Sequence, residues 1–152
     1  MQVLVTGGAG FIGSHVVDAC LAAGHQVAAL DDLSTGKREN VNPAAMLHVA
    51  DLRDRSALDE VLAAVRPEVI FHLAAKANVR ESMVEPVLYA QVNILGSLNL
   101  LESARAHGTR KIVYASTGGA AYGEPQYLPA DEDHPVNPLD PYGASKHHVE
   151  HY

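Results

Sequence analysis

Thr6-Gly7-Gly8-Ala9-Gly10-Phe11-Ile12-Gly13 is the stretch that decides the fold, and it directly follows the apolar run Val3-Leu4-Val5. Glycines at this spacing between a strand and a helix are typical of a dinucleotide-binding turn. Without a Cβ atom, the backbone turns sharply and approaches a pyrophosphate, which the free N–H groups at the helix start then bind. The alternative is a tight turn whose small residues serve packing alone. The stretch therefore predicts a dinucleotide site near the start of the chain.

The choice between NAD and NADP depends on Asp31, which ends the second predicted strand 18 residues after Gly13. A carboxylate at this position accepts hydrogen bonds from the adenosine ribose and repels a 2′-phosphate, which favours NAD. The adjacent Asp32 is a second candidate for this role. Lys37 and Arg38 argue the other way, because a basic pair nearby suits a 2′-phosphate. The remaining alternative is that Asp31 only ends a strand in a turn.

Strand-like and helix-like stretches alternate along the whole chain. Such alternation is typical of a parallel sheet that helices cover on both faces, and right-handed crossovers make that sheet doubly wound. We therefore predict an α/β fold of the Rossmann type, with an irregular proline-rich loop at 123–141 before the last helix. The expected strands span 2–6, 26–30, 46–49, 68–72 and 111–115, and the expected helices span 12–23, 58–65 and 86–108 and begin again at Tyr142.

Composition excludes several classes of function. The chain has 152 residues, of which 47% are apolar, so a folded core is expected. Its net charge of −7 argues against nucleic acid or an anionic membrane as partner. No apolar run is long enough to span a bilayer, and a strand pattern starts at once, so we expect no signal peptide and a cytoplasmic location. The nine histidines are scattered without ligand spacing, so we expect no metal site.

The second informative pattern is the pair Tyr142 and Lys146, four residues apart and so on one face of a helix. A phenol is a poor base at neutral pH, but a neighbouring ammonium lowers its pKa toward a useful value. Such a pair suits proton transfer from an alcohol that loses hydride. The alternative is a helix start with a lysine that reaches to solvent. Ser116 and Thr117 follow the fifth strand, where parallel sheets bind ligands.

Taken together, these motifs resemble the extended short-chain dehydrogenase/reductase family, of the NAD-dependent epimerase/dehydratase type. Within it, the epimerases that act on UDP-glucose and UDP-galactose are the nearest. Sugar 4,6-dehydratases carry Asp-Glu where this chain has Gly119-Ala120, which argues against a dehydratase. The matching strings are TGGAGFIGSH at 6–15, DDLSTG at 31–36, DLRD at 51–54, HLAA at 72–75, NILGSLNLLE at 93–102, STGGAAYGE at 116–124 and PYGASK at 141–146.

The resemblance implies a cofactor site for NAD. The glycine turn holds the pyrophosphate, Asp31 the adenosine ribose, and the 51–52 pair flanks the adenine, while residues 73–75 line the path to the nicotinamide. Asn93 supports the active site from the long helix. The implied cofactor-binding residues are Gly7, Gly10, Phe11, Ile12, Gly13, Asp31, Asp51, Leu52, Leu73, Ala74, Ala75, Asn93, Tyr142 and Lys146.

The resemblance also implies the catalytic residues. Tyr142 is the base that takes the proton from the sugar 4-hydroxyl, and Lys146 tunes it and bonds the nicotinamide ribose. The family places its catalytic hydroxyl where this chain has Gly118, so we assign that role to Thr117, one residue earlier, with Ser116 as the alternative.

The same resemblance implies a longer whole protein. We expect residues 1–152 to be an incomplete NAD-binding Rossmann-like domain, without the last strands and the C-terminal domain that binds the nucleotide-sugar. We also expect the full-length form to be a homodimer. Two alternatives remain open: a non-catalytic NAD-binding module, and a related nucleotide-sugar reductase or epimerase.

Overall fold

The computed structural model describes residues 1–152, and the chain forms two compact units. The first, which we call the sheet unit, comprises residues 1–75 and 99–115. The second, which we call the helical unit, comprises residues 76–98 and 116–152. No helix in either unit has the length and apolar character that a membrane span requires.

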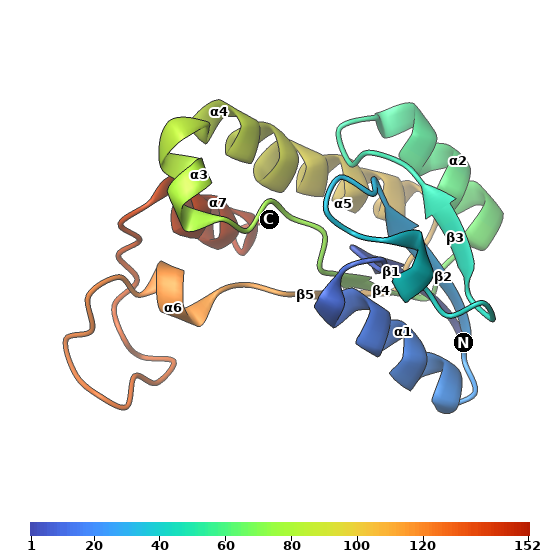
Figure 1. Ribbon diagram of the computed structural model, residues 1–152, viewed down its shortest axis with the longest axis horizontal. Coiled ribbons are helices and arrows are strands. Elements are labelled where there is room, and N and C mark those ends of the chain that lie inside the picture. The colour runs from blue at the N-terminus through green and yellow to red at the C-terminus, as the bar shows by residue number, and fades with distance from the viewer. The chain divides into compact units, whose positions relative to one another are not determined.

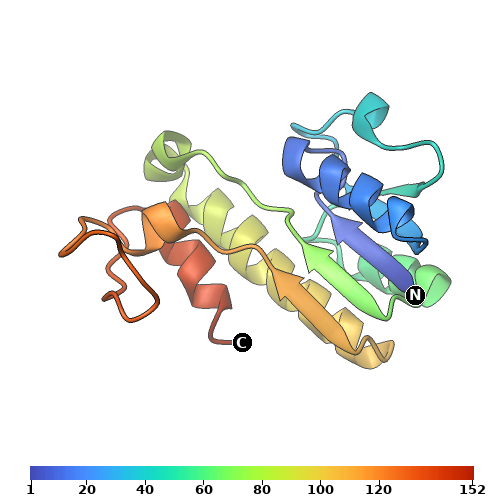
Figure 2. The same ribbon diagram turned by 90° about the horizontal axis from the view of Figure 1, so that it is seen from below.

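The sheet unit is built on five parallel strands in the order β3-β2-β1-β4-β5. Figure 2 shows β4 between β1 and β5. This order confirms the predicted doubly wound sheet, and the strands lie within a residue of their predicted bounds. The strands are β1 at Gln2–Thr6, β2 at Gln26–Asp31, β3 at Met46–Val49, β4 at Val69–His72 and β5 at Lys111–Tyr114.

Successive residues of each strand point to opposite faces of the sheet. Both faces therefore carry apolar side chains, and helices cover both of them. Helix α1 (Phe11–Ala22) covers one face, where Val3 and Val5 pack in a cluster with Val17 (Figure 1). Helix α2 (Arg55–Val65) and the part of α5 (Gly96–Ala106) from residue 99 onward cover the other face. There Leu4 packs in a second cluster with Leu58. The 3₁₀ turn η1 (Arg38–Asn40) lies between β2 and β3.

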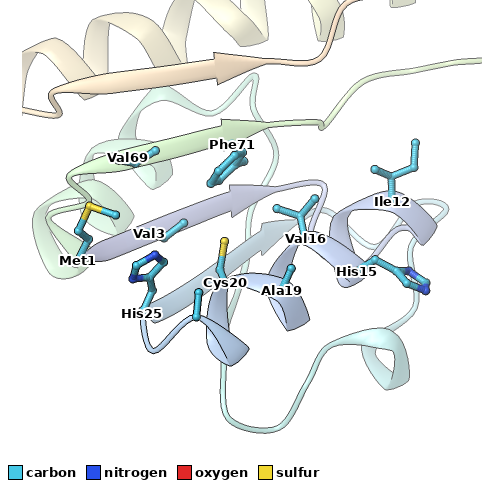
Figure 3. Close-up of a pocket in the computed structure, with 11 residues that line it drawn as sticks. Met1, Val3, Ile12, His15, Val16, Ala19, Cys20, His25, Val69 and Phe71 are labelled. Carbon is cyan, nitrogen blue, oxygen red and sulfur yellow. The ribbon is translucent and has the colours of Figure 1, made fainter.

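The α1 face also carries an open apolar pocket of about 500 Å³. Phe71 and Val69 of β4 line it together with the side of α1 that presents Val16 and Cys20 (Figure 3). Of the residues that the sequence assigns to the cofactor, Ile12 alone contributes to its lining. Because its walls are apolar and lie along α1 rather than at the carboxyl ends of the strands, this pocket is not the predicted dinucleotide site.

The helical unit contains α3 (Val79–Val84), α4 (Pro86–Tyr89), the π-helical turn η2 (Ala90–Leu95), α6 (Gly118–Ala121) and α7 (Pro141–Val149). The predicted single helix at 86–108 is therefore α4, η2 and α5 in succession. Helices α3 and α6 are short and were not predicted, since neither has enough residues to show a periodic pattern. Helix α7 begins at Pro141 because Asp140 caps it, with Oδ1 accepting from the Gly143 N–H at 2.7 Å.

The irregular loop between α6 and α7 is organised around the buried side chain of His134. Its Nε2 accepts a hydrogen bond from the Gln126 N–H at 2.9 Å. The rings of Tyr122 and Tyr127 lie 5.1 and 4.8 Å from the imidazole, centre to centre. The loop predicted from its prolines is thus confirmed, and a small polar and aromatic core holds it.

Candidate functional site

The glycine turn packs so tightly that side chains do not fit at its first and last glycines. A Cβ atom at Gly13 would lie 2.0 Å from the Gly7 carbonyl oxygen, and one at Gly7 would lie 2.8 Å from the Ala74 nitrogen. Helix α1 starts at Phe11 with Gly10 as its N-cap and no side-chain cap. The side chains of Phe11 and Ile12 are exposed. The first N–H groups of α1 are therefore available to an anion such as a pyrophosphate.

Asp31 ends β2 beside this turn and is buried. One carboxylate oxygen accepts from the Ala9 N–H at 3.0 Å, and the other accepts from the Leu33 N–H at 2.9 Å. The Ala9 carbonyl in turn accepts from the Lys37 N–H and from Nδ2 of Asn40, at 3.0 and 2.9 Å. Asp31 thus holds the glycine turn, and each of its carboxylate oxygens keeps a further lone pair that could accept a hydrogen bond from a ligand.

The basic pair and the second acidic candidate are exposed. Lys37 and Arg38 lie at the surface on either side of the start of η1, and Asp32 accepts from the Ser34 N–H and hydroxyl. Asp31 is the buried carboxylate of the two aspartates, and its position at the strand end matches the ribose site.

Asp51 and Leu52 follow β3 and have different environments. The Arg53 guanidinium holds Asp51 in a two-pronged ion pair at 2.5–3.0 Å, and this hydrogen bonding lowers the pKa of the Asp51 carboxyl. Leu52 is buried in the cluster under α2 and α5, while its carbonyl accepts from Nδ2 of Asn99 at 3.1 Å. Asp51 thus lies half-buried with its carboxylate paired to Arg53, and the side chain of Leu52 serves mainly the core.

Leu73, Ala74 and Ala75 continue from β4 and are half-buried. The Leu73 N–H donates to the Thr6 carbonyl at 3.2 Å, and the Ala74 N–H donates to the Thr6 hydroxyl at 3.2 Å. This segment therefore runs beside the glycine turn in the sheet unit.

Asn93 lies in the π-helical turn η2 and is fully buried. Its Oδ1 accepts from the Lys76 N–H at 2.8 Å, and its Nδ2 donates to the Lys76 carbonyl at 3.0 Å and to the Ser145 hydroxyl at 2.9 Å. The Ser145 hydroxyl donates to the Tyr142 carbonyl at 2.8 Å. Asn93 thus fixes α7 and the start of residues 76–78 together. A π-turn at such a position is common at functional sites.

Tyr142 and Lys146 lie one turn apart on α7, as the sequence predicts. Lys146 is 3% exposed, and burial lowers the pKa of its amine to about 8, although the Glu150 charge acts in the opposite direction. Tyr142 is half-buried, with its ring edge-on to Tyr89 at 6.4 Å between centroids. Burial raises the pKa of Tyr89 to about 12, and its hydroxyl binds Asn78 and Glu81. The Tyr89 hydroxyl is thus engaged in holding Asn78 and Glu81.

The two candidate hydroxyls differ in their hydrogen bonding. Ser116 donates its hydroxyl to a carboxylate oxygen of Glu150, whose other oxygen binds Nδ1 of His147 at 2.7 Å. Thr117 is the N-cap of α6, half-buried, and its side chain makes no capping hydrogen bond. Because the Ser116 hydroxyl is engaged with Glu150, this arrangement favours the Thr117 side chain as the hydroxyl that contacts a substrate.

Sequence reasoning missed the supporting residues Ser145, Glu150 and Tyr89. Ser145 lies inside the Tyr142–Lys146 motif and could have been noticed there, but the sequence motif predicted a role only for the tyrosine and the lysine. Glu150 lies four residues after Lys146, a spacing that favours an interaction on one helix face. Nothing in the sequence marks Tyr89, whose role depends on contacts with residues of α3.

The chain matches the NAD dependent epimerase/dehydratase family over residues 3–152. UDP-glucose 4-epimerase of Mycolicibacterium smegmatis is 49% identical over 96% of this chain and 48% of that protein. The structure of Thermus thermophilus UDP-glucose 4-epimerase in complex with NAD is 52% identical, with a TM-score of 0.97 over 100% of this chain and 49% of that chain. UDP-glucose 4-epimerase of Thermotoga maritima, solved with UDP-glucose, is 45% identical, with a TM-score of 0.97 over 100% of this chain and 50% of that chain.

The chain thus spans about half the length of the relatives that it matches. The match nevertheless includes the glycine turn, Asp31 and the Tyr142–Lys146 pair, since it runs from residue 3 to the last residue. On this evidence, the chain belongs to the NAD dependent epimerase/dehydratase family.

Proposed function

We propose that this chain carries the cofactor-binding and proton-transferring residues of an NAD-dependent 4-epimerase that acts on a UDP-hexose. The observation that carries the proposal is Lys146, a buried amine with a pKa lowered to about 8, one helical turn from the accessible Tyr142. A buried ammonium beside a phenol favours the phenolate, which is the form that takes a proton from an alcohol. The names of the relatives and their cofactor and sugar ligands support the same reaction.

The residues of the sheet unit fit NAD. The glycine turn leaves the first N–H groups of α1 without a side-chain cap, as a pyrophosphate site requires. The buried Asp31 carboxylate ends β2 where the ribose hydroxyls are bound in this fold. Residues 1–152 are accordingly proposed as the NAD-binding Rossmann-like part of the enzyme. A homodimer and a cytoplasmic location stay predictions for the whole protein.

The helical unit supplies the proton chemistry. NAD, when bound, would supply the hydride acceptor for the oxidation at the sugar C4 and, in its reduced form, the hydride donor for the return step. Oη of Tyr142, as phenolate, takes the proton of the sugar 4-hydroxyl and returns it to the 4-oxygen after the keto sugar has turned over. The Lys146 ammonium stabilises the phenolate form of Tyr142, which is present before the proton is taken and again after it is returned, and the Thr117 hydroxyl donates to the same sugar oxygen. Asn93 and Ser145 keep α7 in place during both steps.

Titration calorimetry with NAD and NADP tests the cofactor assignment. We expect tighter binding of NAD, because a buried carboxylate repels a 2′-phosphate. Asp31→Asn should remove most of this preference, whereas the matched variant Asp32→Asn, at the exposed neighbour, should keep it. Equal or tighter binding of NADP by the unaltered chain would show that Lys37 and Arg38 prevail.

A coupled assay on UDP-galactose tests the activity of this chain by itself. We expect turnover far below the ~10 s⁻¹ that is typical of enzymes, because the sugar must be held in a reactive geometry and the chain spans only about half the length of its relatives. Turnover within about tenfold of that typical rate would show that these residues alone hold the sugar.

A further inference from the structure

Thr6 and His72 form a buried polar pair at the carboxyl ends of two neighbouring strands. They are paired in register as the last residues of β1 and β4, and their exposed fractions are 0% and 1%. The Thr6 hydroxyl and Nδ1 of His72 are 2.7 Å apart. Among the buried residues of the five strands, only Thr6, Asp31 and His72 are polar or charged, so packing alone does not explain this pair.

The hydrogen bonds around Thr6 bear on which tautomer of His72 the pair uses. The Thr6 hydroxyl oxygen already accepts from the Ala74 N–H at 3.2 Å. Its single hydrogen then needs an acceptor, and Nδ1 of His72 is the acceptor within reach. If Nδ1 carried the proton, the buried Thr6 hydroxyl hydrogen would lose that acceptor, which is costly in a dry site. A Thr6 hydroxyl that donates to Nδ1 requires the tautomer of His72 that carries its proton on Nε2.

Through Thr6, this pair fixes the backbone that faces the glycine turn. The Thr6 carbonyl accepts from the Leu73 N–H at 3.2 Å, so both oxygens of Thr6 hold the segment after β4. Gly7, the next residue, packs directly on that segment, because a Cβ atom there would lie 2.8 Å from the Ala74 nitrogen and 3.1 Å from the Leu73 carbonyl carbon. A small shift of Ala74 therefore displaces the glycine turn.

We propose that Thr6 and His72 are positioning residues for the dinucleotide site: the imidazole orients the Thr6 hydroxyl, and the hydroxyl holds the Ala74 amide against the glycine turn. This inference rests on the proposed NAD binding. Neither side chain needs to touch the cofactor. The pair acts by keeping the pyrophosphate-binding backbone in its binding geometry before the ligand arrives.

The test compares Thr6→Val with Thr6→Ser by calorimetric titration of NAD, at a temperature well below each unfolding midpoint. Valine keeps the shape and the strand preference but loses the hydroxyl, whereas serine keeps the hydroxyl. We expect Thr6→Val to weaken NAD binding about tenfold and Thr6→Ser to stay within about twofold of the unaltered chain. Thr109→Val is the matched control, because the buried Thr109 hydroxyl has no hydrogen-bond partner and lies just before β5. It should leave NAD affinity unchanged.

A second measurement does not depend on the variants or on NAD. The ring nitrogen and carbon resonances of His72 in the unaltered chain should show the Nε2–H tautomer, and those of a Nδ1–H tautomer would overturn the inference. Unchanged NAD affinity in a folded Thr6→Val protein would overturn the inference while leaving the proposed function intact. Failure of the unaltered chain to bind NAD would overturn both.

Discussion

The burial of Lys146 makes a quantitative prediction about stability against pH. The folded-state pKa of its amine is about 8, against an ordinary value of 10.5. At about 1.36 kcal/mol for each pKa unit, this difference of about 2.5 corresponds to about 3 kcal/mol. Because Lys146 is 3% exposed, solvent screening does not reduce this figure greatly.

The sign follows from proton linkage. Between about pH 8 and pH 10.5 the unfolded chain holds a proton on this lysine that the folded chain has released, so stability rises with pH in that window. Below pH 8 the amine is charged in both states and its burial is unfavourable by a constant amount. The free energy of unfolding should therefore gain about 3 kcal/mol from Lys146 across the window.

Urea denaturation at intervals from pH 7 to 10.5 measures this gain against Lys146→Met, which removes the titrating group. The other titrating groups are common to both proteins, so the difference between the two curves reports Lys146 together with any group whose ionisation it changes. Lys111→Met, at an exposed lysine of β5, is the control and should follow the unaltered chain. Parallel curves for the unaltered chain and Lys146→Met would mean that the amine ionises as it does in water. The tuning of Tyr142 by a buried ammonium would then lose its basis.

Two further predictions concern packing and association. Gly13→Ala should lower the unfolding midpoint by about 6–12 °C, which corresponds to a loss of about 3 kcal/mol, because its Cβ would lie 2.0 Å from the Gly7 oxygen. The control Gly119→Ala should be nearly neutral, because a Cβ there meets nothing within 4 Å. Calorimetric scans that show equal losses for the two variants would contradict this. The chain should also associate at high concentration, because β5 pairs with β4 alone and leaves an open edge. Val113→Lys should weaken this association in light scattering, and a clean monomer of the unaltered chain would refute it.

The sequence was sufficient to predict the five strands and a doubly wound parallel sheet, because each strand is an apolar run between recognisable helices. It was not sufficient for α3 and α6, which depend on contacts rather than periodicity. The π-turn at Ala90–Leu95 was also hidden, since one extra residue in a turn leaves the apolar spacing of a long helix almost unchanged.

The sequence predicted the reacting residues of the candidate site better than it predicted the contacts that hold them in place. Tyr142 and Lys146 are recognisable from their spacing, but the burial that lowers the pKa of Lys146 requires the packed unit around α7. The choice between Thr117 and Ser116 depended on Glu150, which is 34 residues from Ser116 in the chain. The pairing of Thr6 with His72 joins residues 66 apart, and only the register of β1 with β4 brings them together.

The hydrogen bond from the Ala9 N–H to Asp31 has a consequence for attempts to redesign the cofactor preference. With the ribose role proposed for Asp31, one carboxylate would both select the ribose and hold the glycine turn, so exchanging residue 31 would alter both properties together. A designer who installs a neutral or basic side chain there loosens the turn that any dinucleotide needs, whichever ribose it carries. Additions at the exposed Lys37 and Arg38, which leave Asp31 in place, disturb no such bond.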